Sequence, residues 1–335
     1  MRKMIKSKLT VLTDPIPWGG DFLYESTRRI ARRVRDAFHL KQQYFNHPIY
    51  RGHFAVTRSL VEGLQAIGAS FNYNPRNPGE LAETVIVLAG VRTLRQAIKF
   101  RREGKIKRLF AGPNIVVFSS DYGSILASPE IDAVITPSDF VSSLYLEDNP
   151  SLNNKILSWP AGVDTDFWKP SLLKNKDRVI VFDKRSKTDG PERTKPYVDF
   201  LSQAGWHVDV LIRSQDRGYS HDQYLKSLQH SSLMIGFTVG SESQGIAWAE
   251  AWAADIPTLI LKNTSNVWAG RRYTCSTAPY LTSQNGLFFD DFEDFKLRFA
   301  YWESHRDQFT PRAWVLEHMS DEVCASRLYE KVLEC

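Results

Sequence analysis

Long apolar runs and cysteines are both scarce in this 335-residue chain. No uninterrupted stretch of about 18 apolar residues occurs, so no segment is expected to span a bilayer. The basic N-terminus, MRKMIKSKLTVLTD, is not followed by a long apolar core, which argues against a secretory signal. Cys275, Cys324 and Cys335 are odd in number and have no metal-ligand spacing, so we interpret them as free thiols in a reducing compartment. A cytoplasmic protein is therefore expected.

Two further absences narrow the classes of function. No G-x-G-x-x-G sequence opens either half of the chain, which argues against a dinucleotide-dependent oxidoreductase. The net charge of +5 and the pI near 9.0 are a mild basic excess. That excess suits an anionic substrate or an acidic membrane face. No recognised nucleic-acid-binding module accompanies it, so nucleic acid is not an expected partner.

The length and the pattern of the chain predict two α/β domains. Composition is that of a folded globular protein, with 42% hydrophobic and 24% charged residues. A chain of this length suits two domains of about 150 residues each. Strands are expected over 8–13, 84–88, 109–110, 115–118, 133–136, 156–158, 178–183, 207–212, 233–237 and 258–261. Helices are expected over 24–38, 56–67, 92–102, 138–147, 194–204, 222–229, 246–254, 292–302 and 311–333, with an irregular region over 268–280. The alternation favours parallel sheets covered on both faces, with domains over 1–170 and 171–335.

The most informative stretch runs from Ser231 to Asn263. An apolar strand is followed by a small-residue loop, an alanine-rich helix that ends before Pro257, and a second apolar strand. A loop of this kind presents backbone N–H groups at a helix N-terminus, where they and the helix dipole favour phosphate. Two carboxylates lie on it, Glu242 in the loop and Glu250 in the helix.

The segment SESQGIAWAEAWAADIPTLI resembles the E-x7-E signature of retaining glycosyltransferases with the GT-B fold. The resemblance implies two Rossmann-like doubly wound domains that face a cleft, with the last helix crossing back to the first domain. It also implies that Glu242 faces the donor sugar, that Glu250 binds the ribose hydroxyls, and that the backbone of Ser243, Gln244 and Gly245 cradles the diphosphate. The alternative is that Glu250 is a solvated helix residue and Glu242 a helix-capping acid.

Other segments resemble the same family. Late in the first domain, that family has a strand that ends in Pro-Ser before a helix, and the segment VITPSDFVSSLY is similar to it. After the nucleotide site, the family has an N-G-x-x-F sequence, and the segment NGLFF is similar to that. PAGVDTDFWKP is similar to its G-V-D-x-x-x-F-x-P linker, so the acids of Asp164-Thr165-Asp166 are interpreted as turn and cap residues, and a metal-binding D-x-D pair is rejected. The resemblance implies catalysis without a metal or any other cofactor.

Basic residues supply the remaining candidates. The family places an Arg and a Lys after the first strand of the second domain, which here favours Lys184 and Lys187, with Arg185 next; a solvated basic turn is the alternative. Either Gly19-Gly20 or Gly52 fits the family's phosphate-facing loop in the first domain. The arginines of 24–38 fit a solvated helix face, with attraction to a membrane surface as the alternative. The basic cluster over 99–108 fits the negative end of a helix dipole, with an acidic acceptor or an anionic membrane leaflet as the alternative.

The resemblance implies a retaining glycosyltransferase of the hexosyltransferase type that moves a sugar from a nucleotide-sugar to a hydroxyl acceptor. The expected acceptor is a glycan or glycolipid in the synthesis of cell-surface polysaccharide or glycoconjugate, with peripheral contact to the inner face of an anionic membrane. Two alternatives are a nucleotide-sugar epimerase on the same fold and a non-catalytic nucleotide-sugar-binding subunit.

Overall fold

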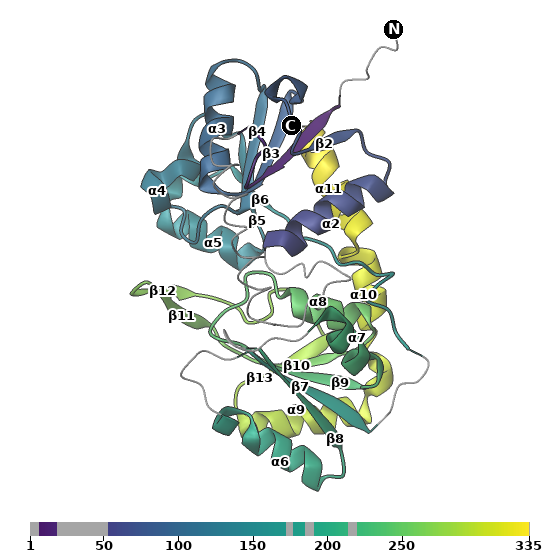
Figure 1. Cartoon of the computed structure of the whole chain (residues 1–335). Coiled ribbons are helices and arrows are strands. Elements are labelled where there is room, and N and C mark those ends of the chain that lie inside the picture. The colour runs from purple at the N-terminus through teal and green to yellow at the C-terminus, as the bar shows by residue number, and fades with distance from the viewer. Residues whose placement is uncertain (1–6, 19–52, 172–176, 185–190, 214–219, 335) are drawn as a thin grey trace, which may run out of the picture. The chain divides into compact units, whose positions relative to one another are not determined.

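The computed structural model describes residues 7–18, 53–171, 177–184, 191–213 and 220–334 (Figure 1). Its contacts divide the chain into two compact units. The first takes in residues up to Pro137, Ser142–Ala161 and the C-terminal residues from Cys324. The second takes in Ser138–Val141 and Gly162–Val323. The helix predicted over 24–38 lies outside the described residues, so its arginine-rich face has no structural account.

The first unit contains a parallel sheet of six described strands in the order β2-β1-β3-β4-β5-β6. The strands are β1 (Leu9–Thr13), β2 (Phe71–Tyr73), β3 (Thr84–Ala89), β4 (Arg108–Asn114), β5 (Ala133–Thr136) and β6 (Ile156–Ser158). Every residue of β1 and β3 is buried, as expected for strands covered on both faces. The helices and short 3-10 turns of this part of the chain are α2 (His53–Ala66), η1 (Pro78–Glu80), α3 (Val91–Arg102), α4 (Asp121–Ser124), η2 (Ile125–Ala127), α5 (Asp139–Asp148) and η3 (Pro150–Leu152).

The second unit contains a parallel sheet of five described strands in the order β13-β10-β9-β7-β8. The strands are β7 (Arg178–Lys184), β8 (His207–Arg213), β9 (Leu233–Phe237), β10 (Thr258–Leu261) and β13 (Gly286–Phe289). The helical elements are η4 (Pro191–Arg193), α6 (Lys195–Gln203), α7 (His221–Gln229), α8 (Ile246–Ala253), α9 (Phe292–Ser304), η5 (Arg306–Gln308), α10 (Pro311–His318) and α11 (Asp321–Glu334), of which α11 passes into the first unit.

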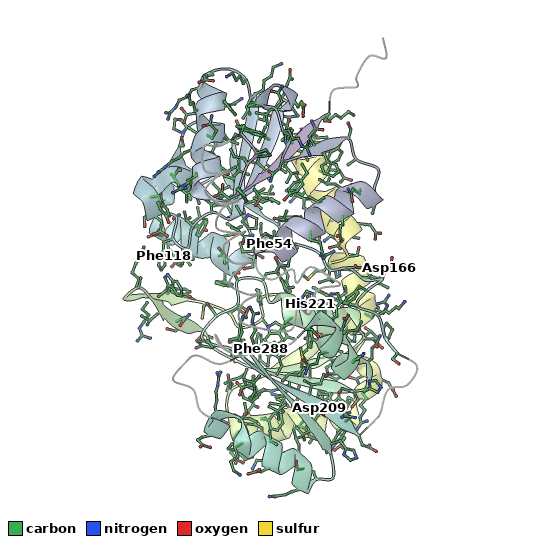
Figure 2. All side chains as sticks on the ribbon, in the orientation of Figure 1. Phe54, Phe118, Asp166, Asp209, His221 and Phe288 are labelled. Carbon is green, nitrogen blue, oxygen red and sulfur yellow. The ribbon has the colours of Figure 1, made fainter. Side chains whose placement is uncertain are left out.

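Alternate residues of β7 face two separate hydrophobic clusters. Ile180 and Phe182 pack with Trp248 on one side of the sheet, whereas Val179 and Val181 pack with the aromatic side chains of α9 on the other. This two-residue period follows from strand geometry, and it explains why the strand is apolar throughout. Figure 2 shows the side chains that fill the space between the sheets and their helices.

Three sequence predictions about elements were wrong. The single helix predicted over 311–333 is two helices, because Met319 and Ser320 leave the helical path: Val163 N donates to Met319 O at 2.9 Å, and Ser320 pairs with Val163 in a β-bridge. The Ser320 hydroxyl then accepts from Val323 N at 3.2 Å, which begins α11 with a side-chain cap.

The region predicted to be irregular over 268–280 begins with an antiparallel hairpin of β11 (Ser265–Trp268) and β12 (Arg271–Thr274). Ala269 and Gly270 turn the chain with φ values of 50° and 78°, which is the positive-φ geometry of a two-residue hairpin turn. Finally, β4 runs unbroken to Asn114, so 115–118 is not a strand; Gly112 permits this because its backbone, at φ 125°, lies against the carbonyl of Ile135.

None of the helices in the described ranges is both long enough and apolar enough to cross a membrane.

The cations predicted to cluster over 99–108 are paired with acids of the same unit. Arg101 contacts Asp132 at 3.2 Å, Arg102 contacts Glu130 at 2.6 Å, and Lys107 contacts Glu83 at 3.0 Å. Their local pairing supports the structural interpretation of this cluster.

Candidate functional site

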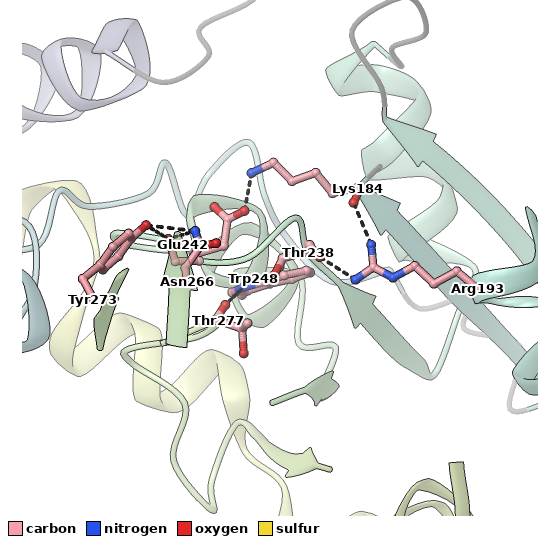
Figure 3. Close-up of polar contacts among 9 residues, drawn as sticks. Lys184, Arg193, Thr238, Glu242, Trp248, Asn266, Tyr273 and Thr277 are labelled. Atoms are coloured by element: carbon pink, nitrogen blue, oxygen red, sulfur yellow. Dashed lines mark hydrogen bonds and ion pairs between the residues drawn. The ribbon is translucent and has the colours of Figure 1, made fainter. Parts of the chain in front are cut away.

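Lys184 and Glu242 meet at the carboxyl edge of the second sheet. Strands β7 and β9 are parallel neighbours in register, with Asp183 opposite Phe237, so the residues that follow both strands emerge at one edge. Lys184 ends β7, and Glu242 lies in the loop after β9, where the lysine ammonium donates to the glutamate Oε1 (Figure 3). The two side chains are 31% and 17% exposed, so the pair is half-buried but reachable from solvent.

The loop from Thr238 to Gly245 is held by hydrogen bonds to its backbone. The Arg193 guanidinium donates to the Thr238 carbonyl, and at 3.3 Å to the Lys184 carbonyl (Figure 3). Asn263 Nδ2 donates to Gly240 O at 2.8 Å. Because these bonds use the backbone of the loop, they fix its path without engaging the Glu242 carboxylate.

The base of the β11–β12 hairpin supports the same loop. The Tyr273 hydroxyl lies 2.9 Å from Ser241 Oγ and accepts from Asn266 Nδ2 at 2.9 Å. Glu242 N donates to Ser276 O at 2.9 Å, just beyond the hairpin. Gly240, at φ 86°, allows the close approach, since a Cβ there would lie 2.4 Å from the Asn266 amide. The hairpin therefore positions the residues on both sides of Glu242.

Gly245 begins α8 in the left-handed conformation, with φ 77°. A Cβ at this position would lie 2.4 Å from Cδ1 of Trp248. Trp248 is itself fixed, because its Nε1 donates to Thr277 O at 2.8 Å and its ring packs edge-on against Phe182. The N-cap residue of α8 is this glycine, which makes no side-chain cap, and the N–H groups of Trp248 and Ala249 donate to its carbonyl at 3.0 and 3.2 Å.

Glu250 is a buried helix residue, with 9% of its surface exposed. The interpretation of Glu250 as a solvated residue is therefore wrong, because α8 is covered on nearly all sides. Glu242 does not cap α8 either, since its carboxylate contacts Lys184 and the helix has no side-chain cap. Of the other predicted loop residues, Gln244 is buried at 4% exposure and Ser243 is exposed.

Of the predicted site residues, the structure thus brings Glu242, Ser243, Gln244, Gly245 and Lys184 to one edge of the second sheet, with Glu250 buried in the helix that follows the loop. Five others lie outside the described residues: Gly19, Gly20, Gly52, Arg185 and Lys187.

Sequence reasoning missed Arg193, Asn266 and Tyr273. Arg193 ends η4, two residues before α6 begins, and its guanidinium reaches the Lys184 carbonyl; the predicted order of strand and helix could have indicated this position. Asn266 and Tyr273 belong to the hairpin that was not predicted. Their contacts with the loop depend on the register of this hairpin. An Ala-Gly turn is a weaker sequence signal for a two-residue hairpin than Asn-Gly or Asp-Gly, so the register was not predictable.

Two other polar groups have structural explanations. Burial raises the pKa of the Cys275 thiol, so it stays protonated and is a poor nucleophile beside Gly240. Asp164 Oδ1 accepts from the backbone N–H groups of Asp166 and Phe167 at 3.0 and 2.9 Å, which is the turn role predicted for this acid. Within the ranges that the structure describes, no group of three or more His, Cys, Asp or Glu residues could hold a metal ion.

Solved structures share this architecture. No family model matches the sequence, and no curated protein matches it. A glycosyltransferase from Rickettsia africae ESF-5 is similar over 98% of both chains, with a TM-score of 0.55 and 10% identity. The fold is that of GT-B glycosyltransferases.

Two further structures show the same likeness. Anabaena Alr3699/HepE, solved in complex with UDP, has a TM-score of 0.55 and 12% identity over 98% of this chain and 100% of that chain. The lipopolysaccharide outer core galactosyltransferase WaaB has a TM-score of 0.54 and 11% identity over 97% and 99%. The predicted fold class, two α/β domains with parallel sheets, is confirmed. At 10–12% identity the likeness shows the fold alone.

Proposed function

We propose that this protein is a retaining glycosyltransferase that uses a nucleotide-sugar donor and a hydroxyl acceptor. The observation that supports this most is the Lys184–Glu242 pair, held at the start of α8 by a loop with a fixed backbone. A donor diphosphate needs cations and N–H donors, and a donor sugar needs an acceptor of its hydroxyl hydrogen bonds. This edge of the second sheet supplies both, from the end of β7 and from the loop between β9 and α8.

The geometry supports an exchange of partners when the donor binds. Lys184 leaves the Glu242 carboxylate for the diphosphate, which carries more negative charge and also lies on the positive end of α8. Glu242 is then free to accept hydrogen bonds from the sugar. Glu250, buried in the same helix, takes the ribose hydroxyls. HepE was solved with UDP and with UDP-glucose, which favours a uridine nucleotide here as well.

The transfer step follows from that arrangement. The bond between the anomeric carbon and the phosphate oxygen breaks, while the N–H groups near Gly245 and the Lys184 ammonium stabilise the departing negative charge. The acceptor hydroxyl attacks from the same face, and its proton passes to the departing phosphate oxygen, so the configuration is retained. The step uses no metal. The proposed acceptor is a glycan or glycolipid on the cytoplasmic side of a membrane, in the synthesis of cell-surface polysaccharide.

Thermal unfolding in the presence of a panel of nucleotides and nucleotide-sugars tests the proposal. A ligand at 100 times its Kd adds about 2.7 kcal/mol of stability, which a shift in Tm reports. We expect UDP-sugars to stabilise the wild type, and Glu250→Ala and Lys184→Met to remove most of the shift. Lys195→Met is the matched control, because Lys195 is an exposed lysine of the same unit that pairs with Asp199. Equal shifts in all four proteins would refute the proposed donor site.

A second assay separates the three classes of function. A transferase consumes the donor in the presence of an acceptor, and Glu242→Gln abolishes turnover while nucleotide binding persists. An epimerase changes the sugar without an acceptor, and a binding subunit shows donor-dependent stabilisation with no turnover in any variant.

A further inference from the structure

The β11–β12 hairpin of the second unit ends in a run of exposed residues, 267–272. Figure 1 shows this hairpin extending away from the parallel sheet of its own unit. Val267 and Trp268 are 50% and 55% exposed, and Ala269 and Gly270 form the turn between the strands. Large apolar side chains at the end of such a projection are unfavourable in water, and they gather where a protein contacts a partner.

Trp268 stands out among the tryptophans of the chain. All nine tryptophans lie in the described residues, and Trp268 is the one that is exposed; the other eight are buried or half-buried. Seven of those eight are less than 9% exposed. The chain therefore covers its largest apolar side chains elsewhere, and the exposure at the hairpin tip is a departure from that pattern.

The register of the hairpin places one apolar residue and one arginine on each face of its tip. Trp268 pairs with Arg271, and Val267 pairs with Arg272. Directly paired residues share a face, whereas neighbours along a strand point to opposite faces. A platform for a single glycan or peptide would gather its apolar and charged groups on one face. Because both faces carry the same combination here, the tip suits a medium that surrounds it.

The charge of this region has one sign. No Asp or Glu occurs in the sequence between Asp255 and Asp290, whereas the hairpin tip contains Arg271 and Arg272. Both arginines are exposed, and Arg272 Nη1 donates to the Ser265 hydroxyl, an uncharged group, at 3.1 Å. The tip therefore complements a negatively charged partner.

The surface of an anionic bilayer matches both the apolar and the cationic groups of the tip. Tryptophan is enriched at the headgroup level of membranes, where one part of the ring is apolar and the indole N–H is wet. Arginine places its aliphatic stem along apolar groups and its guanidinium among the headgroups. Anionic lipids attract each such arginine with a free energy that corresponds to about a five-fold gain in affinity.

We propose that the tip of the β11–β12 hairpin docks on the surface of an anionic lipid bilayer, with Val267 and Trp268 at the headgroup level and Arg271 and Arg272 on lipid phosphates. The docking goes beyond the proposed function, because it requires neither donor nor acceptor.

The consequence of docking for the enzyme does rest on the proposed function. The Tyr273 hydroxyl lies 2.9 Å from Ser241 Oγ, so the base of the hairpin contacts the residue next to Glu242. Trp268 lies two residues beyond Asn266, which also contacts this base, and that separation is roughly 7 Å along a strand. A docked tip therefore holds the donor loop close to the bilayer, where a glycolipid acceptor would lie.

Vesicle co-sedimentation of the full chain tests the docking without any nucleotide. The vesicles contain phosphatidylcholine alone, or phosphatidylcholine and phosphatidylglycerol in equal amounts. We expect the wild type to bind the mixed vesicles, Arg271→Gln/Arg272→Gln to bind them about 30-fold more weakly, and Trp268→Ala about ten-fold more weakly. Vesicles of phosphatidylcholine alone should bind the wild type about as weakly as the mixed vesicles bind the double arginine variant.

The matched controls come from α9 of the same unit. Leu297 is 70% exposed, and the Arg298 side chain is 47% exposed. Leu297→Ala and Arg298→Gln remove an exposed apolar group and an exposed cation, respectively, away from the hairpin, so both variants should bind the mixed vesicles like the wild type. The melting temperature of each variant checks that it is folded.

Quenching of tryptophan fluorescence by bromine-labelled phosphatidylcholine in the mixed vesicles distinguishes insertion of the tip from adhesion by charge alone. The wild type should be quenched, whereas Trp268→Phe, which keeps an aromatic ring at the tip, should sediment with the vesicles but lose most of the quenching.

Four results would overturn the proposal: no binding of the wild type to the mixed vesicles, equal binding of the hairpin variants and the wild type, equal quenching of the wild type and Trp268→Phe, or equal affinity of the wild type for soluble polygalacturonate, which would indicate an acidic glycan instead. Thermal unfolding with UDP-sugars reports the donor site separately, so either site can fail alone.

Discussion

Replacing Gly245 with alanine tests how tightly the loop before α8 is packed. Gly245 has φ 77°, and a Cβ there would lie 2.4 Å from Trp248, whose ring is held by Thr277 and cannot move aside freely. Gly205 is a matched control in the same unit: its φ is 89°, and a Cβ there would meet nothing within 4 Å. Both substitutions force alanine into a positive φ, at a cost of roughly 1–2 kcal/mol, and both reduce the entropy of the unfolded chain equally.

Only Gly245→Ala adds overpacking, which costs typically about 1–3 kcal/mol. We therefore expect Gly245→Ala to lower the free energy of unfolding by about 2–5 kcal/mol, which is about 1–3 kcal/mol more than Gly205→Ala. Urea unfolding followed by tryptophan fluorescence measures both. Equal destabilisation by the two substitutions would show that the contact with Trp248 is not rigid, and would refute the account of a fixed loop.

Three further predictions concern single groups. Hydrogen bonds from Arg102 and Ser128 lower the pKa of Glu130 from 4.5 to about 2, so the ionised carboxylate stabilises the fold fully above pH 4.5 and this stabilisation is lost as the pH falls toward 2. The difference in free energy of unfolding between the wild type and Glu130→Gln should therefore shrink over that range. A carboxyl NMR titration should place the midpoint near 2. Because Cys275 is buried with a raised pKa, its alkylation at pH 8 should be far slower in the native protein than in urea, and mass spectrometry of the labelled peptide checks this; comparable rates would show that the thiol is accessible. Arg193→Ala removes two hydrogen bonds to carbonyls at the loop and should weaken UDP binding by about ten-fold, measured by calorimetry, with unchanged affinity as the contrary result.

Much of the second unit was predictable because its signals are local. The apolar run at 233–237 and the breakers around α8 predicted a strand and a helix within one residue of those observed. Parallel pairing then brings Lys184 to the edge where Glu242 lies. The contacts of Arg193 and Tyr273 were not predictable, since they depend on the direction of long side chains and on the register of a hairpin whose turn carries alanine at positive φ. The break between α10 and α11 was missed because it depends on pairing with distant Val163.

The central claim is that a nucleotide-sugar diphosphate docks on the loop between β9 and α8. Amide hydrogen exchange with and without a saturating UDP-sugar tests it most directly, because it reports which backbone N–H groups the ligand covers. The account predicts slower exchange in the peptide that spans Gly240 to Ala249, with the effect lost in Lys184→Met. Slower exchange confined to other parts of the chain, with this peptide unchanged, would contradict it.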